Sequence, residues 1–155
     1  MTDIAIIGAG PYGLSIAAHL KARGVRFRIF GKAMDAWRAH MPKGMHLKSE
    51  GFASGLYDPD STFTLAKYCQ QEAIPYADVG VPTPLDVFSS YGLKFQERFV
   101  PELEEKSVDS VARTSSGFRI CLAQGETVTA RRVVIATGLS GFEQVPPSLE
   151  ALGEQ

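Results

Sequence analysis

The sequence has 155 residues, of which 45% are apolar and 21% are charged, as in one ordinary globular domain. The formal net charge of −1 gives no field that would favour nucleic acid or an anionic membrane, and no apolar run approaches the roughly 20 residues of a membrane span. The two cysteines and three histidines show no metal-ligand spacing. We therefore expect a cytoplasmic protein with small-molecule partners, no bound metal, and no nucleic-acid or membrane partner.

The N-terminal part of the chain predicts a β-α-β unit. Residues 4 to 7, IAII, form an apolar run without polar alternation, which is typical of a strand buried on both faces. A helix is expected from about Tyr12 to Arg23, and Gly24 suits the position that follows a helix. Residues 25 to 30, VRFRIF, then alternate apolar and basic side chains, which predicts a second strand.

The turn between the first strand and the helix is GAGPYG, residues 8 to 13, a match to the G-x-G-x-x-G pattern. In this context Gly8 permits a tight turn, Gly10 lets the backbone approach a pyrophosphate, and Gly13 lets the helix pack closely on the sheet. The helix N-terminus would offer free N–H groups to the phosphates. The strand before the motif and the unit that closes after it make a dinucleotide site the favoured interpretation.

The rest of the chain changes pattern twice. Residues 31 to 62 have no sustained period and predict a functional loop, and helices are expected over residues 63 to 74 and 85 to 99. From Val108 the period is two, so that SVDSVAR, GFRICLA and ETVTARR predict an antiparallel meander. RRVVIATG then predicts a separate buried strand parallel to the first. Its end, Ala136 to Gly138, should face the same crevice as the glycine motif.

Three stretches together carry a family resemblance: GAGPYGLS, the loop DAWRAHMPKGMHLKS and the closing RRVVIATG. They resemble the FAD-binding half of two-dinucleotide-domain flavoproteins, in particular flavin-dependent monooxygenases of the N-hydroxylating lysine/ornithine type and their FAD/NAD(P)-binding relatives. The resemblance implies an α/β, Rossmann-like fold with a parallel sheet, a helical excursion and an inserted antiparallel β-meander. It also implies FAD as cofactor, and NAD(P)H as electron donor of the intact enzyme.

The chain has the sequence features of one nucleotide-binding domain, which affects the activity expected of it. The resemblance makes residues 1–155 an FAD-binding domain, expected to be the N-terminal part of a longer oxidoreductase. The chain contains one G-x-G-x-x-G motif, whereas those monooxygenases carry a second one for NADPH. A non-catalytic nucleotide-binding module therefore stays open as an alternative.

Several site residues follow from the resemblance alone. Trp37 matches a tryptophan that packs near the flavin, Met45 and Leu47 match positions that line the isoalloxazine pocket, and a backbone group near Val108 would meet the adenine. Core packing is an equal alternative for Trp37, Met45 and Leu47. No catalytic residue is predicted. The expected cofactor-binding residues are Gly8, Gly10, Pro11, Tyr12, Gly13, Gly31, Lys32, Trp37, Met45, Leu47, Val108, Ala136, Thr137 and Gly138.

The chain departs from the family at the end of the second strand. The usual residue there is an acid that accepts hydrogen bonds from the adenosine ribose, whereas this sequence has Gly31 followed by Lys32. We interpret Gly31 and Lys32 as a variant ribose contact for FAD, with Asp35 as a substitute acid from the loop. A basic residue is also what recognition of a 2′-phosphate needs, so an NADP-binding domain is the alternative. Lys32 as a solvated surface charge is a third possibility.

Overall fold

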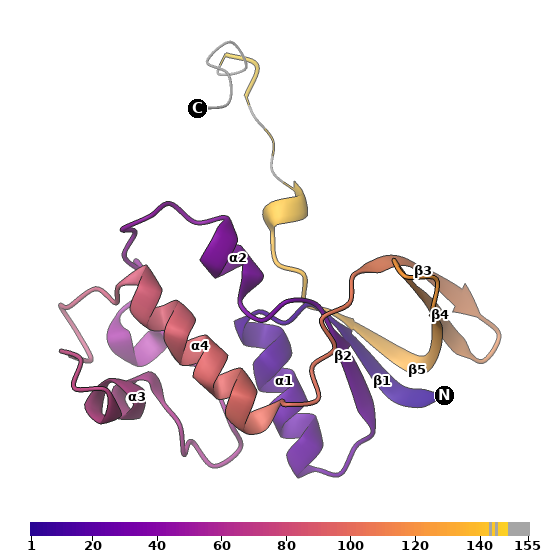
Figure 1. The fold of residues 1–155 in the computed structure, drawn as a ribbon, viewed down its shortest axis with the longest axis horizontal. Helices are drawn as coiled ribbons and strands as arrows, with labels where there is room; N and C mark the ends of the chain where they lie inside the picture. Colours follow the sequence, from indigo (N-terminus) through magenta and orange to yellow (C-terminus); the bar gives the residue numbers. More distant parts are fainter. Residues whose placement is uncertain (143, 145, 149–155) are drawn as a thin grey trace.

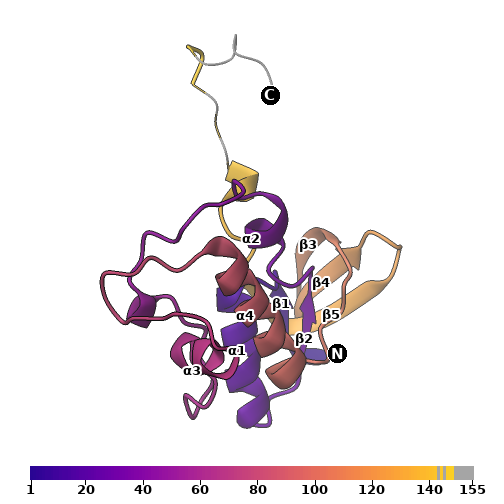
Figure 2. The same cartoon turned by 60° about the vertical axis from the view of Figure 1, so that its left-hand side comes forward.

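The computed structural model describes residues 1–142, 144 and 146–148. They form one five-stranded sheet with the strand order β2-β1-β5-β4-β3 (Figure 1). Helices α1 and α4 cover one side of the parallel strands, and α2 and α3 belong to the segment that joins β2 to α4 (Figures 1 and 2). The predicted α/β, Rossmann-like fold with an antiparallel meander is confirmed. The strands are β1 Thr2–Ile7, β2 Phe27–Phe30, β3 Val108–Thr114, β4 Gly117–Leu122 and β5 Thr127–Ile135, and the helices are α1 Pro11–Ala22, α2 Asp35–Ala39, α3 Leu65–Gln71 and α4 Leu85–Phe99.

The predicted return of a strand parallel to β1 is confirmed, but the number of strands predicted there was wrong. The last strand of the meander and the returning parallel strand are a single strand, β5. Its first part pairs antiparallel with β4, from Thr127 opposite Cys121 to Ala130 opposite Phe118. Its second part pairs parallel with β1, ending with Ile135 opposite Ile7. No Gly, Pro or Asn interrupts the segment, so the chain does not turn within it. The change from alternating to continuous apolar residues marks the point where the neighbouring strand changes from β4 to β1, and not the end of the strand.

The two faces of the parallel strands bury separate clusters, as expected for a strand like β1 that is apolar on both sides. Ile6 and Ile29 face the helices and are fully buried with Leu14 of α1 and Tyr91 and Phe95 of α4. The opposite face carries a smaller cluster that joins the parallel strands to the meander. Its buried members are Ala5, Phe30, Ile120, Leu122, Val128 and Ala130.

The long segment between β2 and α4 is ordered by buried hydrogen bonds. The Tyr91 hydroxyl donates to the Phe63 carbonyl at 2.9 Å and accepts from the Leu56 N–H at 3.1 Å. Thr64 caps α3 by accepting from the Lys67 N–H, close to the predicted start of that helix. These contacts attach an irregular segment to the helical layer, which makes it a defined surface instead of a free loop.

Asp58 holds the same segment together through hydrogen bonds, and its carboxylate should make the stability of the protein fall at low pH. Its buried carboxylate accepts from the N–H groups of Thr62 and Phe63 at 3.0 Å each, and from the Thr62 hydroxyl at 3.0 Å. Burial opposes ionisation, but these donors outweigh it and hold the pKa of Asp58 below its ordinary value. The folded state therefore binds the proton more weakly than the unfolded state, so this stabilisation is present above the unfolded pKa and is lost as the pH falls through the folded one.

We therefore expect the stability of the wild-type protein to decline below about pH 4, and the Asp58→Asn variant to be less stable at pH 7 with a flatter acid decline. Urea unfolding at pH 7, 5, 4 and 3 measures both slopes. Asp60→Asn is the matched control, because the Asp60 side chain is exposed. Parallel acid slopes for wild type and Asp58→Asn would contradict the assignment.

Candidate functional site

The carboxyl ends of the three parallel strands meet at one edge of the sheet. The Gly8 N–H donates to the Phe30 carbonyl at 2.8 Å, and the Ala136 N–H donates to the Ile7 carbonyl at 2.7 Å. These bonds bring the residues that follow β1, β2 and β5 together. In open α/β sheets this edge is where ligands bind.

The glycine motif leaves no room for side chains at two of its positions and leaves room at a third. Gly8 has a φ of +110°, and a Cβ there would collide with the Ala136 carbonyl. A Cβ on Gly13 would collide with the Gly8 carbonyl, so the helix backbone rests directly on the turn. A Cβ on Gly10 would meet no atom within 4 Å. The space in front of Gly10 is therefore open to a ligand.

Helix α1 begins at this open position without a cap. Gly10 is its N-cap residue, with extended backbone, and no side chain accepts from the first-turn N–H groups. Pro11 occupies the first helical position, where its missing N–H costs nothing, and the first turn has no acidic residue. An uncapped helix N-terminus of this length presents N–H donors and positive potential to an anion.

The uncapped helix opens into a cavity of about 800 Å³, which we call the glycine-loop cavity. This volume lies within the range of about 300–1,000 Å³ that is usual for cofactor and ligand pockets. Its wall is formed by the glycine turn, the start of α2 with Trp37, and the residues after β5. Nine predicted site residues line it: Gly8, Gly10, Pro11, Tyr12, Lys32, Trp37, Ala136, Thr137 and Gly138.

Five predicted site residues do not line this cavity. Gly13 lies under the turn, and Gly31 lies behind it. Leu47 is buried in the helical core, and Val108 pairs with Leu122 and packs against the meander cluster. Met45 lines a second cavity, described below. Leu47 and Val108 therefore lie in the packed interior, and neither lines the glycine-loop cavity.

Gly31 has a conformation that explains why an acid is absent there. Its φ is +131°, in a region that residues with a side chain rarely adopt, and a Cβ would lie 3.3 Å from the Ala9 nitrogen. Its N–H donates to the Glu104 carbonyl at 3.1 Å. The chain then turns through Met34, whose N–H donates to the Ala9 carbonyl at 3.0 Å. This turn brings both Lys32 and Asp35 to the glycine-loop cavity.

Three residues that the sequence analysis missed line the cavity from α2 and just beyond it: Ala36, His40 and Met41. Ala36 pairs with His40, and Met41 pairs with the predicted Trp37. Members of each pair are four residues apart, so a helix puts them on one face. The short stretch DAWRAHM gave this signal, but five helical residues are too few for a period to be read.

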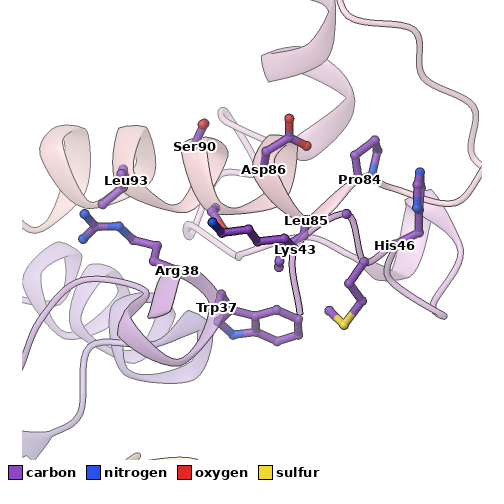
Figure 3. Close-up of a pocket in the computed structure, with 12 residues that line it drawn as sticks. Trp37, Arg38, Lys43, His46, Pro84, Leu85, Asp86, Ser90 and Leu93 are labelled. Carbon is purple, nitrogen blue, oxygen red and sulfur yellow. The ribbon is translucent and has the colours of Figure 1, made fainter. Parts of the chain in front are cut away.

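Trp37 also lines a second cavity of about 580 Å³, which we call the α4 cavity (Figure 3). Figure 3 shows Trp37 on one side, the α4 residues Asp86, Ser90 and Leu93 on the other, and the side chains of Arg38 and Lys43 extending between them. The Trp37 indole packs edge-on against Phe88, with ring centroids 4.8 Å apart. This one side chain therefore separates two cavities and is fixed by the aromatic core.

A family model described as FAD-NAD(P)-binding matches residues 5–140. The chain belongs to this FAD-NAD(P)-binding family. The matched range begins in β1, includes the glycine turn and both cavities, and ends just after β5. The resemblance to FAD/NAD(P)-binding flavoproteins that the sequence predicts is thereby confirmed.

Relatives of this FAD-NAD(P)-binding domain are monooxygenases and reductases. Indole-3-pyruvate monooxygenase YUCCA1 of Oryza sativa subsp. japonica is 28% identical over 151 residues, which cover 91% of this chain and 33% of that protein. The ferredoxin–NADP reductase of Granulibacter bethesdensis is 26% identical over 151 residues, which cover 97% and 36%. The chain thus spans about a third of the length of these curated relatives.

Solved structures share the fold of the FAD-NAD(P)-binding domain. A flavin-containing monooxygenase from Stenotrophomonas maltophilia superposes with a TM-score of 0.71 and 22% identity, over 88% of this chain and 38% of that one. Bacillithiol disulfide reductase from Staphylococcus aureus superposes with a TM-score of 0.68 and 19% identity, over the same shares. Within the part of the chain that the structure describes, no helix has the length and apolar character to cross a bilayer.

Proposed function

We propose that residues 1–155 form the FAD-binding domain of a cytoplasmic NAD(P)H-dependent flavin oxidoreductase of the monooxygenase type. One observation carries the proposal: the open Gly10 position at an uncapped helix N-terminus leads into a cavity whose wall includes Trp37. The curated relatives that are monooxygenases support the reaction type, and the reductase among them supports NAD(P)H as electron source.

The residues that line the glycine-loop cavity fit FAD. The N–H groups at the start of α1 would bind the pyrophosphate, with Gly10 permitting its close approach. Asp35 would accept hydrogen bonds from the ribose hydroxyls, beside Lys32. Thr137 and Gly138 would contact the cofactor from the opposite wall, and Trp37 would pack on the flavin side. Bound FAD would supply the hydride and dioxygen chemistry, which the protein side chains lack.

A second candidate is an NADP-binding domain of a reductase. The observation in its favour is the position of Lys32, which is exposed and lines the same cavity. A lysine there would contact a 2′-phosphate, which NADP carries and FAD does not. Two substitutions separate the candidates, because FAD binding should depend on Asp35 and NADP binding on Lys32.

The test is a titration of the purified protein with FAD and, separately, with NADPH, followed by the fluorescence of Trp37, which is the one tryptophan in the sequence. We expect FAD to bind, Asp35→Asn to weaken it about tenfold through lost charge-assisted hydrogen bonds, and Lys32→Gln to change it less than about threefold. The visible spectrum after removal of free flavin gives a second readout. Tight NADPH binding that Lys32→Gln removes, without any FAD binding, would overturn the proposal in favour of the second candidate.

A further inference from the structure

The α4 cavity carries an excess of basic side chains at its rim. Arg38, Lys43 and His46 line it, and Asp86 is the one acidic residue that does. Within the described residues neither Arg38 nor Lys43 forms an ion pair, and one Arg38 N–H donates only to the Ala33 carbonyl, at 3.3 Å. The Asp86 carboxylate accepts from the Val87 N–H at 2.9 Å, so it already has a partner at the helix start. The rim is thus suited to an anionic group.

The wall below this rim is apolar. Trp37, Met45, Leu85 and Leu93 contribute to it, and more of the accessible wall is apolar than polar. A fully charged ligand such as free phosphate would leave this wall uncovered. A small molecule with an aromatic or aliphatic body and one negatively charged end covers both parts.

A buried hydroxyl on α4, beside the cavity, lacks a hydrogen-bond partner. Ser89 lines the cavity, has only 9% of its surface exposed, and its Oγ has no hydrogen-bond partner among the described residues. Buried hydroxyls in folded proteins are nearly always paired, because an unpaired one costs free energy. Because this oxygen is itself buried, a ligand in the cavity would reach it only after a local shift of the wall.

The cavity is held in shape before any ligand arrives. The Leu47 N–H donates to the Thr83 carbonyl at 2.8 Å, and the Leu85 N–H donates to the Met45 carbonyl at 3.0 Å. These two bonds fix the loop that carries Met45 and His46 against the start of α4. A site fixed in this way loses little conformational entropy on binding.

We infer that the α4 cavity binds a small organic carboxylate with an apolar body, and that it is the substrate side of the proposed enzyme. The carboxylate would lie at Arg38 and Lys43, and the body along Trp37 and Leu93. Because Trp37 lines both cavities, this molecule would bind beside the cofactor in the glycine-loop cavity. The assignment of the ligand as substrate rests on the proposed function, whereas the selectivity for a carboxylate rests on the cavity itself.

The test uses the indole N–H of Trp37 as a single NMR probe in protein labelled with nitrogen-15. The protein is titrated with 4-phenylbutyrate and with its uncharged amide, 4-phenylbutanamide, with and without FAD. We expect a saturable shift of this resonance with the carboxylate, about tenfold weaker binding of the amide, and the same carboxylate affinity when FAD is bound.

Four variants locate the charge. Arg38→Gln and Lys43→Gln should each weaken the binding of 4-phenylbutyrate several-fold, and the binding of the amide should not change. Asp86→Asn should strengthen the binding of the carboxylate, because it removes a negative charge from the cavity. Lys48→Gln is the matched control, since Lys48 is an exposed lysine close to the same loop but outside both cavities. All four side chains are exposed, so the fold should tolerate their removal.

Three results would overturn the inference. Equal affinity for acid and amide would show that the basic rim does not select an anion. Competition between 4-phenylbutyrate and FAD would place the ligand in the glycine-loop cavity. FAD binding without any carboxylate binding would overturn this inference and leave the proposed function in place. Carboxylate binding without FAD binding would instead overturn the proposed function and leave the carboxylate selectivity of the cavity in place.

Discussion

A Gly10→Val variant should keep the fold and lose FAD, whereas the smaller change Gly13→Ala should weaken the fold itself. A side chain at Gly10 meets no protein atom within 4 Å, and the residue has an ordinary extended backbone with a φ of −78°. Valine there costs only the N-cap preference, about 1 kcal/mol. It occupies the space through which the pyrophosphate would reach the helix N–H groups. Losing two hydrogen bonds from these N–H groups to the charged pyrophosphate should weaken FAD binding about a hundredfold or more.

At Gly13 the collision is with backbone that is itself held in place. The new Cβ meets the Gly8 carbonyl, and Gly8 is fixed by its own hydrogen bond to Phe30. Alanine gains about 1 kcal/mol in helix propensity, but forcing the helix off the turn costs more, so we expect a net loss of about 2 kcal/mol. Urea unfolding of both variants without cofactor, set beside FAD titrations, measures the two effects separately. Full stability of Gly13→Ala, or full FAD affinity of Gly10→Val, would contradict the roles given to these glycines.

Those parts of the fold whose signals are local could be predicted from the sequence. The β-α-β unit was predicted because each of its signals lies within a short run of consecutive residues. These signals are the continuous apolar run of β1, the glycine turn and the alternation in β2. Helix α4 has the predicted bounds because its aromatic stripe repeats every four residues and a proline precedes it. Eight of the nine predicted residues that line the glycine-loop cavity follow from the same source, since strand ends determine which residues meet at the edge of the sheet. The ninth, Trp37, came from the family resemblance.

The remaining features depend on contacts between distant segments. Leu47 is placed by its bond to Thr83, and the α4 cavity exists because that bond brings the loop against the start of α4. Nothing within either segment specifies this pairing. The continuity of β5 was missed for a related reason: a strand with an antiparallel neighbour at one end and a parallel neighbour at the other has two burial patterns along its length.

Restoring the family's usual acid with Gly31→Asp should weaken the protein and its cofactor binding. The aspartate would have to adopt a φ of +131°, which costs about 1–3 kcal/mol, and its Cβ would press on the Ala9 nitrogen at 3.3 Å. The glycine turn would have to shift to relieve that contact. We therefore expect Gly31→Asp to lower both the free energy of unfolding and the affinity for FAD, the latter about tenfold or more.

The neighbouring acid cannot take over the ribose contact. The Glu104 carboxylate is held by two hydrogen bonds from Arg28, at 2.6 and 2.7 Å, and the Arg28 guanidinium keeps the pKa of Glu104 below its ordinary value. Asp35 is therefore the carboxylate that faces the cavity. Gly31→Ala is the control for Gly31→Asp, because it adds the same backbone strain without a charge, and the two should lose similar affinity in FAD titrations. If Gly31→Asp instead bound FAD more tightly than the wild type, the ribose contact would belong at position 31, and Asp35 would have no part in it.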